Sequence, residues 1–346
     1  MKYFLTGGAG FIGSNFIRYL LTHYQDIKIL NFDNLTYAGN LNNLSDIEND
    51  PRYSFVKGDI CKIKKIETVF DQFQPDYVVN FAAETHVDRS ILHPNIFVKS
   101  NVLGVQNLLQ VSLQQGIKKY LQISTDEVYG SLGKTGMFKE TTPLDPRSPY
   151  SASKASADLL TQAYFHTFNL QINITRCSNN YGSSQFPEKL IPLTILNCLS
   201  GKTIPVYGDG LNVRDWIHVE DHCSAIDLVL HKGVAGEIYN VGAYNERSNI
   251  EIVKLIIQHL ADLRPDLEVS EALISYVEDR KGHDRRYALD STKIQKELHW
   301  KPSIPFEQGL KNTIRWYLDN PEWLDSIIKK DYLAYYQKVY GNKSPE

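Results

Sequence analysis

A tyrosine and a lysine lie four residues apart in the segment Tyr150–Lys154, directly after Pro149. Proline is favoured in the first turn of a helix, so the segment is predicted to open one, and residues four apart share a helical face. An ammonium near the phenol favours the phenolate; lowering a tyrosine pKa from about 10 towards 7 requires about 4 kcal/mol. Such a phenolate accepts the proton of a hydroxyl group while a hydride leaves. The pair indicates alcohol oxidation, although an isolated Tyr-x-x-x-Lys is more often a solvated helix face.

The hydride needs an acceptor, and a glycine-rich segment predicts one. Gly7, Gly10 and Gly13 follow an apolar run and open a predicted helix. The early glycines permit a tight turn and a close approach to pyrophosphate, and the last lets the helix pack against the strand. The helix N-terminus then offers free N–H groups to the phosphates. Strand, loop and helix in this register predict a dinucleotide-binding site.

Two acidic residues follow the next two predicted strands. Asp33 lies about twenty residues after Gly13, where a carboxylate accepts hydrogen bonds from ribose hydroxyls and repels a 2′-phosphate. This favours NAD over NADP. Asp59 is placed to approach the adenine, but an N-cap of the following helix is an equally good reading.

Short apolar runs and helix-length segments alternate through the first half of the chain. This alternation predicts an α/β fold of the Rossmann type, a doubly wound parallel sheet whose ligands bind beyond the carboxyl ends of the strands. The predicted strands are Lys2–Thr6, Lys28–Phe32, Tyr53–Lys57, Tyr77–Phe81, Tyr120–Ser124 and Gln171–Arg176. The predicted helices are Ile12–Tyr24, Ile63–Phe73, Asn95–Gln115 and Tyr150–Phe168.

The rhythm changes after about residue 177, where loops lengthen and Pro and Gly become frequent. Helices are expected at Glu188–Ser200, Val219–His231 and Asn249–Leu260. We expect residues 1–176 to form an NAD-binding Rossmann domain that also carries the catalytic residues. Residues 177–330 are expected to form a smaller C-terminal substrate-binding lobe, with the chain re-entering the first sheet near 237–241. Residues 331–346 are expected to be a C-terminal tail.

Composition narrows the class of protein. The 346 residues carry a net charge of −3, with 42% hydrophobic and 22% charged residues. This balance, without basic clusters, argues against nucleic acid or a membrane as partner. No run reaches the ~18 apolar residues of a membrane span, and nothing resembles a signal peptide. The four cysteines lack metal-ligand spacing, so free thiols in a reducing cytoplasm are expected and no metal site is predicted.

Further segments resemble the dTDP-glucose 4,6-dehydratases, a family of the extended short-chain dehydrogenase/reductase superfamily. The similar segments, together with the glycine loop and Tyr150–Lys154, span residues 1 to about 302. They are Leu35–Asn40, Ala82–Ser90, Ser124–Gly130, Cys177–Gly182, Arg214–Trp216 and Gly282–Tyr287. The resemblance implies an NAD-dependent hydro-lyase that oxidises carbon 4 of a nucleotide-linked hexose, eliminates water across carbons 5 and 6, and returns the hydride to carbon 6.

The triplet Thr125-Asp126-Glu127 distinguishes this reaction from simpler ones. Elimination of water needs a base for the hydrogen on carbon 5 and an acid for the hydroxyl on carbon 6. The resemblance implies that Glu127 is the base, Asp126 the acid, and Thr125 a donor to the oxygen at carbon 4, with Tyr150 and Lys154 completing the catalytic set. Two neighbouring carboxyls in a desolvated cleft do not both ionise easily, so one is expected to stay protonated.

The resemblance also implies which residues contact each ligand. The cofactor-binding residues are Gly7, Gly10, Phe11, Ile12, Gly13, Asp33, Asn34, Leu35, Thr36, Asp59, Ile60, Phe81, Ala82, Ala83, Thr85, Ser100, Tyr150, Lys154 and Asn180. The substrate-binding residues are Thr85, Thr125, Asp126, Glu127, Tyr150, Asn179, Lys189, Leu190, Pro205, Tyr207, Arg214, Asn249, Asp279 and His283. Arg214 is the main candidate for the diphosphate because guanidinium binds phosphate bidentately; an ion pair with Asp215 or Asp221 is the alternative. Tyr207 is expected to stack on the base.

Other functions remain open at this stage. A nucleotide-sugar 4-epimerase would need the NAD site and Tyr150/Lys154 but not the Asp126–Glu127 pair. A decarboxylase of a nucleotide-linked glucuronic acid would need a cation for the sugar carboxylate, and the same dehydration could act on a different nucleotide sugar. A non-catalytic NAD-binding regulator would need none of the four side chains. By family analogy a homodimer is expected, formed by the helices around Asn101–Gln115 and Tyr150–Phe168.

Overall fold

The computed structural model describes residues 1–280 and 282–327, so the predicted tail 331–346 lies outside the described residues. Within them, the largest sheet has the strand order β10-β6-β5-β4-β1-β2-β3, and every pairing in it is parallel. Its strands are β1 (Lys2–Thr6), β2 (Lys28–Asp33), β3 (Tyr53–Lys57), β4 (Tyr77–Asn80), β5 (Lys119–Thr125), β6 (Ile172–Cys177) and β10 (Ile238–Val241). The predicted α/β fold class is confirmed.

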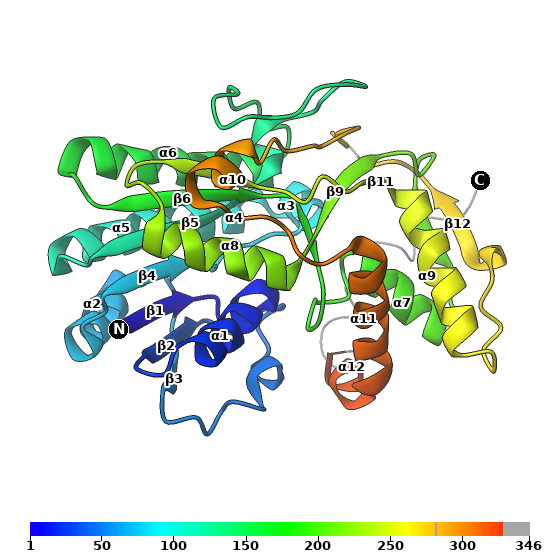
Figure 1. The fold of residues 1–346 in the computed structure, drawn as a ribbon, viewed down its shortest axis with the longest axis horizontal. Helices are drawn as coiled ribbons and strands as arrows, with labels where there is room; N and C mark the ends of the chain where they lie inside the picture. Colours follow the sequence, from blue (N-terminus) through cyan, green and yellow to red (C-terminus); the bar gives the residue numbers. More distant parts are fainter. Residues whose placement is uncertain (281, 328–346) are drawn as a thin grey trace.

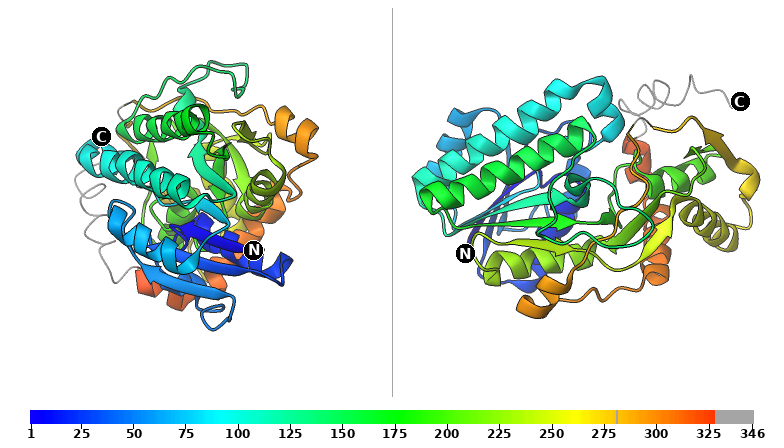
Figure 2. Two further views of the ribbon diagram at one scale, coloured as in Figure 1. Left: turned by 90° about the vertical axis from the view of Figure 1, so that its left-hand side faces the viewer. Right: turned by 90° about the horizontal axis from the view of Figure 1, so that it is seen from above.

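Helices cover both faces of this sheet (Figure 1). One face carries α1 (Phe11–His23) and α8 (Val219–Lys232), which pack against each other. The other face carries α2 (Ile63–Phe73), α5 (Gly104–Gln115) and α6 (Pro149–Phe168); α5 and α6 lie side by side in Figure 2.

Strand β1 illustrates why the sheet is buried on both sides. Tyr3 and Leu5 belong to the core beneath α1 and α8, whereas Phe4 belongs to the core beneath α2 and α5. All three side chains are fully buried. Successive side chains of a strand point to opposite faces, so a strand between two helical layers is apolar throughout its length.

The expected helix Asn95–Gln115 is confirmed as one helical run, but its hydrogen-bond pattern changes along its length. The chain forms α3 (Val87–Leu92), the single turn α4 (Pro94–Phe97) and a π-helical stretch η2 (Val98–Leu103) before α5 begins. The wider turn of a π-helix shifts the side chains that follow it, and such stretches often lie at functional sites. Sequence periodicity does not resolve a change of this kind.

The second half of the chain adds a smaller lobe, at the right of Figure 1. Its helices α7, α9, α11 and α12 share a core that includes Ile191, Ile252, Leu310 and Trp323. The elements of this lobe are β7 (Asn179–Tyr181), α7 (Leu190–Leu199), β8 (Ile204–Tyr207), β9 (Val213–His218), β11 (Glu246–Ser248), α9 (Asn249–Leu263), β12 (Ile274–Val277), α11 (Phe306–Asp319) and α12 (Pro321–Ile327). Helix α10 (Thr292–Leu298) instead packs against β10 and α8 of the first lobe. The 3-10 turns are η1 (Leu41–Leu44), η3 (Asp126–Tyr129) and η4 (Glu271–Leu273).

The strand order reverses between β1 and β4, so the loops after these strands diverge and leave a crevice at the carboxyl edge of the sheet. Thr6, Asp33, Asn80, Thr125 and Cys177 end the strands at this edge. None of the helices in the described part of the chain combines the length and hydropathy that a bilayer-spanning segment requires.

Candidate active site

A long cleft runs from the glycine loop, across the carboxyl ends of β1, β4 and β5, into the second lobe. The predicted cofactor residues that line it are Gly7, Gly10, Phe11, Ile12, Gly13, Asp33, Asn34, Thr36, Asp59, Ile60, Phe81, Ala82, Ala83, Thr85, Ser100, Tyr150, Lys154 and Asn180. Leu35 is not among the described residues that line it. Its amide instead donates to Oδ1 of Asp33 at 2.7 Å.

The glycine loop has the shape that a dinucleotide needs. Gly7 has a φ of +69°, and a Cβ there would lie 2.6 Å from the amide nitrogen of Ala82. A Cβ on Gly13 would collide with the carbonyl oxygen of Gly7. Helix α1 begins after Gly10, which has no side chain to cap it. Free first-turn amides and close backbone packing fit a pyrophosphate.

Asp33 and Asp59 both reach the cleft, with different local roles. Oδ1 of Asp33 accepts the amide of Leu35, and Oδ2 accepts the amide of Ala9 at 3.0 Å. These bonds orient the carboxylate, although burial still raises its pKa. Asp59 accepts the amide of Cys61 at 2.8 Å in the turn before α2. The N-cap of α2 is Lys62, so the alternative of an N-cap at Asp59 is wrong.

At the end of β5, the chain turns into the 3-10 helix η3, and this turn directs the acidic pair to the cleft. Thr125 is the N-cap: its Oγ1 accepts the amide of Glu127 at 3.3 Å and donates to Oδ1 of Asp126 at 3.2 Å. All three residues line the cleft. The strict alternation of strand residues therefore does not apply, because η3 starts at Asp126.

The two carboxyls have different electrostatic environments. Burial raises the pKa of Asp126 well above its ordinary value, and neighbouring Glu127 raises it further. Burial also raises the pKa of Glu127, but Lys189, Arg214 and Arg280 oppose this rise. The pKa of Asp126 is therefore raised more strongly than that of Glu127, so Asp126 is the better proton carrier of the pair.

Tyr150 and Lys154 lie in the first turns of α6, which begins at Pro149. Ser148 caps the helix, and its hydroxyl accepts the amide of Ser151 at 3.0 Å in a capping box. The ammonium of Lys154 donates to the carbonyl of Ile123 at 2.6 Å, at the end of β5. Helix α6 is thereby held against the strand that carries the acidic pair.

Taken together, the protein's own groups raise the Tyr150 pKa, contrary to the expectation from Lys154. Burial, Glu127 and Cys177 raise the Tyr150 pKa well above its ordinary value, while a hydrogen bond with Thr125 lowers it in part. Burial lowers the pKa of Lys154. The cause is a dry site with a carboxylate nearby. A bound, oxidised nicotinamide ring would add a positive charge that favours the phenolate.

The second lobe and the loops beside it supply the rest of the cleft. The predicted substrate residues that line it are Thr85, Thr125, Asp126, Glu127, Tyr150, Asn179, Lys189, Leu190, Pro205, Tyr207, Arg214, Asn249 and His283. Asp279 is not among the lining residues that the structure describes. Its Oδ1 lies 2.6 Å from Nδ1 of His283, so Asp279 contacts a side chain that lines the cleft.

Arg214 is buried beside the acidic pair. Its guanidinium donates to the carbonyls of Val213 at 2.8 Å and Asp284 at 2.9 Å, and it stacks on the ring of Tyr287 at 4.3 Å. The alternative ion pair is wrong: Asp215 accepts backbone amides of Ala243 and Asn245, and Asp221 accepts those of Ser303 and Ile304. Carbonyls accept these hydrogen bonds and no carboxylate forms an ion pair with Arg214 among the described residues, so its guanidinium suits an anion.

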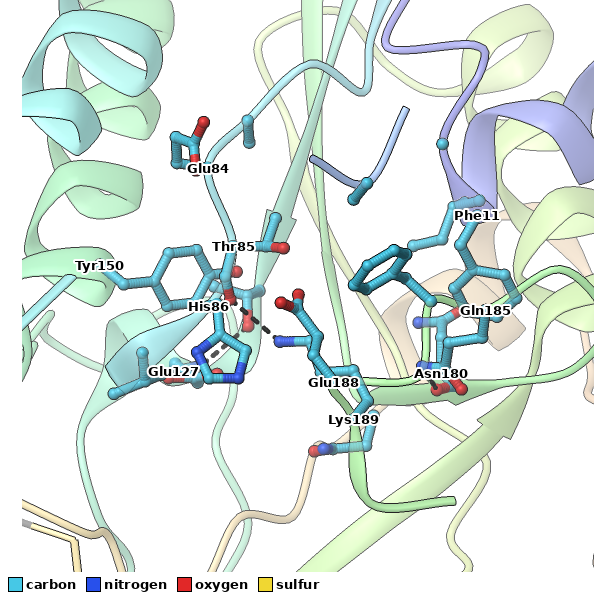
Figure 3. Close-up of a pocket in the computed structure, with 18 of the residues that line it drawn as sticks. Phe11, Glu84, Thr85, His86, Glu127, Tyr150, Asn180, Gln185, Glu188 and Lys189 are labelled. Carbon is cyan, nitrogen blue, oxygen red and sulfur yellow. Dashed lines mark hydrogen bonds between the residues drawn. The ribbon is translucent and has the colours of Figure 1, made fainter. Parts of the chain in front are cut away.

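Several lining residues had no predicted role. Glu188, beside Lys189, is buried, and burial raises its pKa to about 7. Its Oε1 accepts the hydroxyl of Tyr37 at 3.0 Å. Arg280 contacts Asp88 at 2.7 Å and lies 5.0 Å from the Tyr207 ring centre. Figure 3 shows Glu188 and Lys189 entering the space between Tyr150 and Phe11.

Two residues of this group lie within the sequence segments that resemble the dehydratase family. Tyr37 lies within Leu35–Asn40 and Asp88 within Ala82–Ser90, so both could have been singled out. Glu188 and Arg280 lie far from them in the sequence, and only the packing of the two lobes brings them together.

Comparison with known proteins decides the family. The family model described as GDP-mannose 4,6 dehydratase matches residues 4–313. A dTDP-glucose 4,6-dehydratase of Xanthomonas campestris pv. campestris (strain B100) is 50% identical over 339 residues, covering 95% of this chain and 96% of the relative. The chain belongs to the dTDP-glucose 4,6-dehydratase family.

Two solved structures of such dehydratases resemble this one closely. The enzyme of Bacillus anthracis, in complex with NAD, is 51% identical with a TM-score of 0.87, covering 94% of this chain and 99% of that one. The enzyme DesIV of Streptomyces venezuelae, with NAD and TYD bound, is 46% identical with a TM-score of 0.90, covering 94% and 100%. This dehydratase therefore has the complete architecture of both relatives.

Proposed function

We propose that this chain converts dTDP-glucose to dTDP-4-keto-6-deoxyglucose, with Thr125, Asp126, Glu127, Tyr150 and Lys154 as its catalytic residues and NAD as its cofactor. The observation that carries the proposal is the acidic pair: Asp126 and Glu127 line the cleft that holds Tyr150, and the pKa of Asp126 is raised more strongly than that of Glu127. Oxidation and re-reduction at one carbon would need neither of them.

The residues that would hold the cofactor are the glycine loop, Asp33 and the walls of the adjoining cleft. When bound, NAD would supply the hydride acceptor for carbon 4 of the sugar and the hydride donor for carbon 6. Tyr150 takes the proton of the hydroxyl at carbon 4, and the Thr125 hydroxyl turns its hydrogen from Oδ1 of Asp126 to donate to the same oxygen. Lys154 holds α6 in place through the carbonyl of Ile123.

The elimination falls to the acidic pair. The ketone at carbon 4 makes the hydrogen on carbon 5 acidic, and ionised Glu127 removes it as a proton, which it gives back to carbon 5 when the hydride reaches carbon 6. Protonated Asp126 donates its proton to the hydroxyl at carbon 6, which leaves as water. The burial of both groups strengthens their electrostatic effects.

The second lobe holds the nucleotide. Arg214 binds the diphosphate and Tyr207 stacks on the base, with Asn179, Lys189, Leu190, Pro205 and Asn249 completing the pocket. This arrangement supports the proposed division into residues 1–176 and 177–330, with the chain re-entering the first sheet near 237–241. The first part supplies the glycine loop and the catalytic groups, and most of the nucleotide pocket comes from the second.

A substrate panel tests the function. The purified chain is incubated with dTDP-glucose, UDP-glucose, CDP-glucose and GDP-mannose, and the alkaline absorbance of the ketosugar is followed. We expect the highest kcat/KM with dTDP-glucose. Conversion of a UDP-sugar to its carbon-4 epimer, without ketosugar, would instead identify an epimerase.

The chain is expected to act in the cytoplasm as a homodimer. Val98, Leu103 and Leu159 are exposed by 56%, 48% and 57%, and they lie on η2 and α6, which contact each other. A second copy is the occupant that would cover these apolar side chains symmetrically. Light scattering should give twice the chain mass, and Leu159→Lys should shift it towards the monomer. A monomer mass for the unaltered chain would contradict the dimer.

A further inference from the structure

The side chain of Tyr37 connects the two lobes across the cleft. Its hydroxyl donates to Oε1 of Glu188 at 3.0 Å, and its ring meets the ring of Phe186 edge-on at 5.7 Å. The guanidinium of Arg89 lies 3.6 Å from the ring centre. Tyr37 thus joins the loop after β2, helix α3 and the segment before α7.

This tyrosine borders the part of the cleft that belongs to the dinucleotide. The loop that carries it is fastened to the glycine loop, because the amide of Asn40 donates to the carbonyl of Ala9 at 2.9 Å. Tyr37 lines the cleft, as do Asp33 and Ile12. A ligand lying along α1 and Asp33 therefore passes beside the ring of Tyr37.

We propose that Tyr37 is a positioning residue that retains the dinucleotide, because its link to Glu188 must open before the cofactor leaves. The inference rests on the proposed function, in which one hydride leaves the sugar and later returns to it. A cofactor that escaped between these steps would strand an oxidised sugar. The link holds the two lobes together during that interval.

The hydrogen bond has a defined direction. Burial and the nearby Glu188 and Glu84 raise the pKa of Tyr37 well above its ordinary value, so its phenol keeps its proton and acts as the donor. The Glu188 carboxyl is the acceptor. A phenylalanine at position 37 would keep the ring packed between Arg89 and Phe186 and remove only this donor.

The test measures cofactor release in the full chain. NAD bound to the purified protein is counted after denaturation, and its release is timed by dilution into labelled NAD. We expect Tyr37→Phe to release NAD about ten-fold faster, the effect of one hydrogen bond to a carboxyl group. Tyr37→Ala also loses the cation–π contact and should release it on the order of a hundred-fold faster. Tyr276→Ala, at a tyrosine 52% exposed on β12, is the control and should release NAD as the unaltered chain does.

A double-mutant cycle separates this link from general loosening. If Tyr37 acts through Glu188, the release rates of Tyr37→Phe, Glu188→Ala and the double variant will not be additive. Thermal unfolding of Tyr37→Phe verifies that the fold is intact. Release from Tyr37→Phe at the unaltered rate, additive effects, or an unaltered chain that holds no NAD would overturn the inference. If the unaltered chain forms ketosugar but Tyr37→Phe releases NAD at the unaltered rate, the inference fails and the proposed function stands. If the unaltered chain retains NAD through the Tyr37 link but forms no ketosugar, the proposed function fails instead.

Discussion

Oδ1 of Asp126 accepts a hydrogen bond from the Thr125 hydroxyl at 3.2 Å, while its buried Oδ2 has no partner among the described residues. A buried oxygen without a partner is costly for a carboxylate and much less so for a carboxylic acid. The protonated form of Asp126 places an O–H group in the cleft, where the proposed reaction needs an acid. Thr125 thereby orients the acid and, through the Glu127 amide, the base.

The base is tested by Glu127→Gln, which preserves shape and removes the charge. We expect this variant still to reduce bound NAD slowly when substrate is added, because that step uses Tyr150. Ketosugar release should fall by about 10²–10⁴-fold, the usual worth of a general base. Absorbance of the reduced cofactor and of the alkaline ketosugar measure the two steps. Exposed Glu268→Gln is the control. Normal turnover in Glu127→Gln would remove Glu127 from its role.

Asp126→Asn is expected to raise the Tm relative to the unaltered chain, and to raise it more at higher pH. The raised folded-state pKa of Asp126 means that the folded protein binds more protons than the unfolded chain above the ordinary pKa, so stability falls as pH rises through this window. Asparagine is neutral throughout. Its Tm advantage over the unaltered chain should therefore be small below about pH 4 and grow towards neutrality. Exposed Asp71→Asn should show no such trend. A Tm difference independent of pH would mean that Asp126 is not protonated at neutral pH.

Tyr150→Phe tests the first proton transfer. Without the phenol, the hydroxyl at carbon 4 loses its base, so cofactor reduction itself should fall by about 10²–10⁴-fold. Substrate affinity should change little, because the ring remains. Single-turnover absorbance and equilibrium titration with dTDP separate the two effects. Tyr276→Phe serves as the matched exposed control. Cofactor reduction at the unaltered rate would contradict the assignment.

Gly13→Ala tests the cofactor loop. The added Cβ would collide with the carbonyl oxygen of Gly7, so α1 must move away from the loop. We expect loss of the NAD-induced rise in Tm. Gly133→Ala is the control, since a Cβ there meets nothing within 4 Å. An equal NAD response in both variants would show that close packing at Gly13 is not needed.

A buried ion pair stabilises the frame behind the catalytic helix. Arg176 of β6 and Asp158 of α6 lie 2.8 Å apart with 2% and 0% of their side chains exposed. Asp158→Asn leaves a buried guanidinium without its counter-charge and should cost about 3–5 kcal/mol of unfolding free energy. Asp46→Asn breaks the exposed pair with Arg18 and should cost at most about 1 kcal/mol. Urea denaturation measures both, and equal losses would refute the distinction.

Local patterns in the sequence determined the features that depend on a few neighbouring residues. The spacing of Gly7, Gly10 and Gly13 specifies a turn and a helix start, because it concerns one strand, one loop and one helix. The alternation of apolar runs and helices likewise determined the Rossmann-type fold, since a strand buried on both faces is apolar along its length. The motif Thr125-Asp126-Glu127 identified the family through its residue types.

Only the tertiary structure decided how these groups behave. The raised pKa values of Asp126 and Tyr150 and the bond from Lys154 to Ile123 depend on burial and on groups from distant segments. Tyr37 and Glu188 are 151 residues apart and meet across the cleft. Electrostatic energies depend on distance through space and on the exclusion of water, and the separation of two residues in the sequence determines neither.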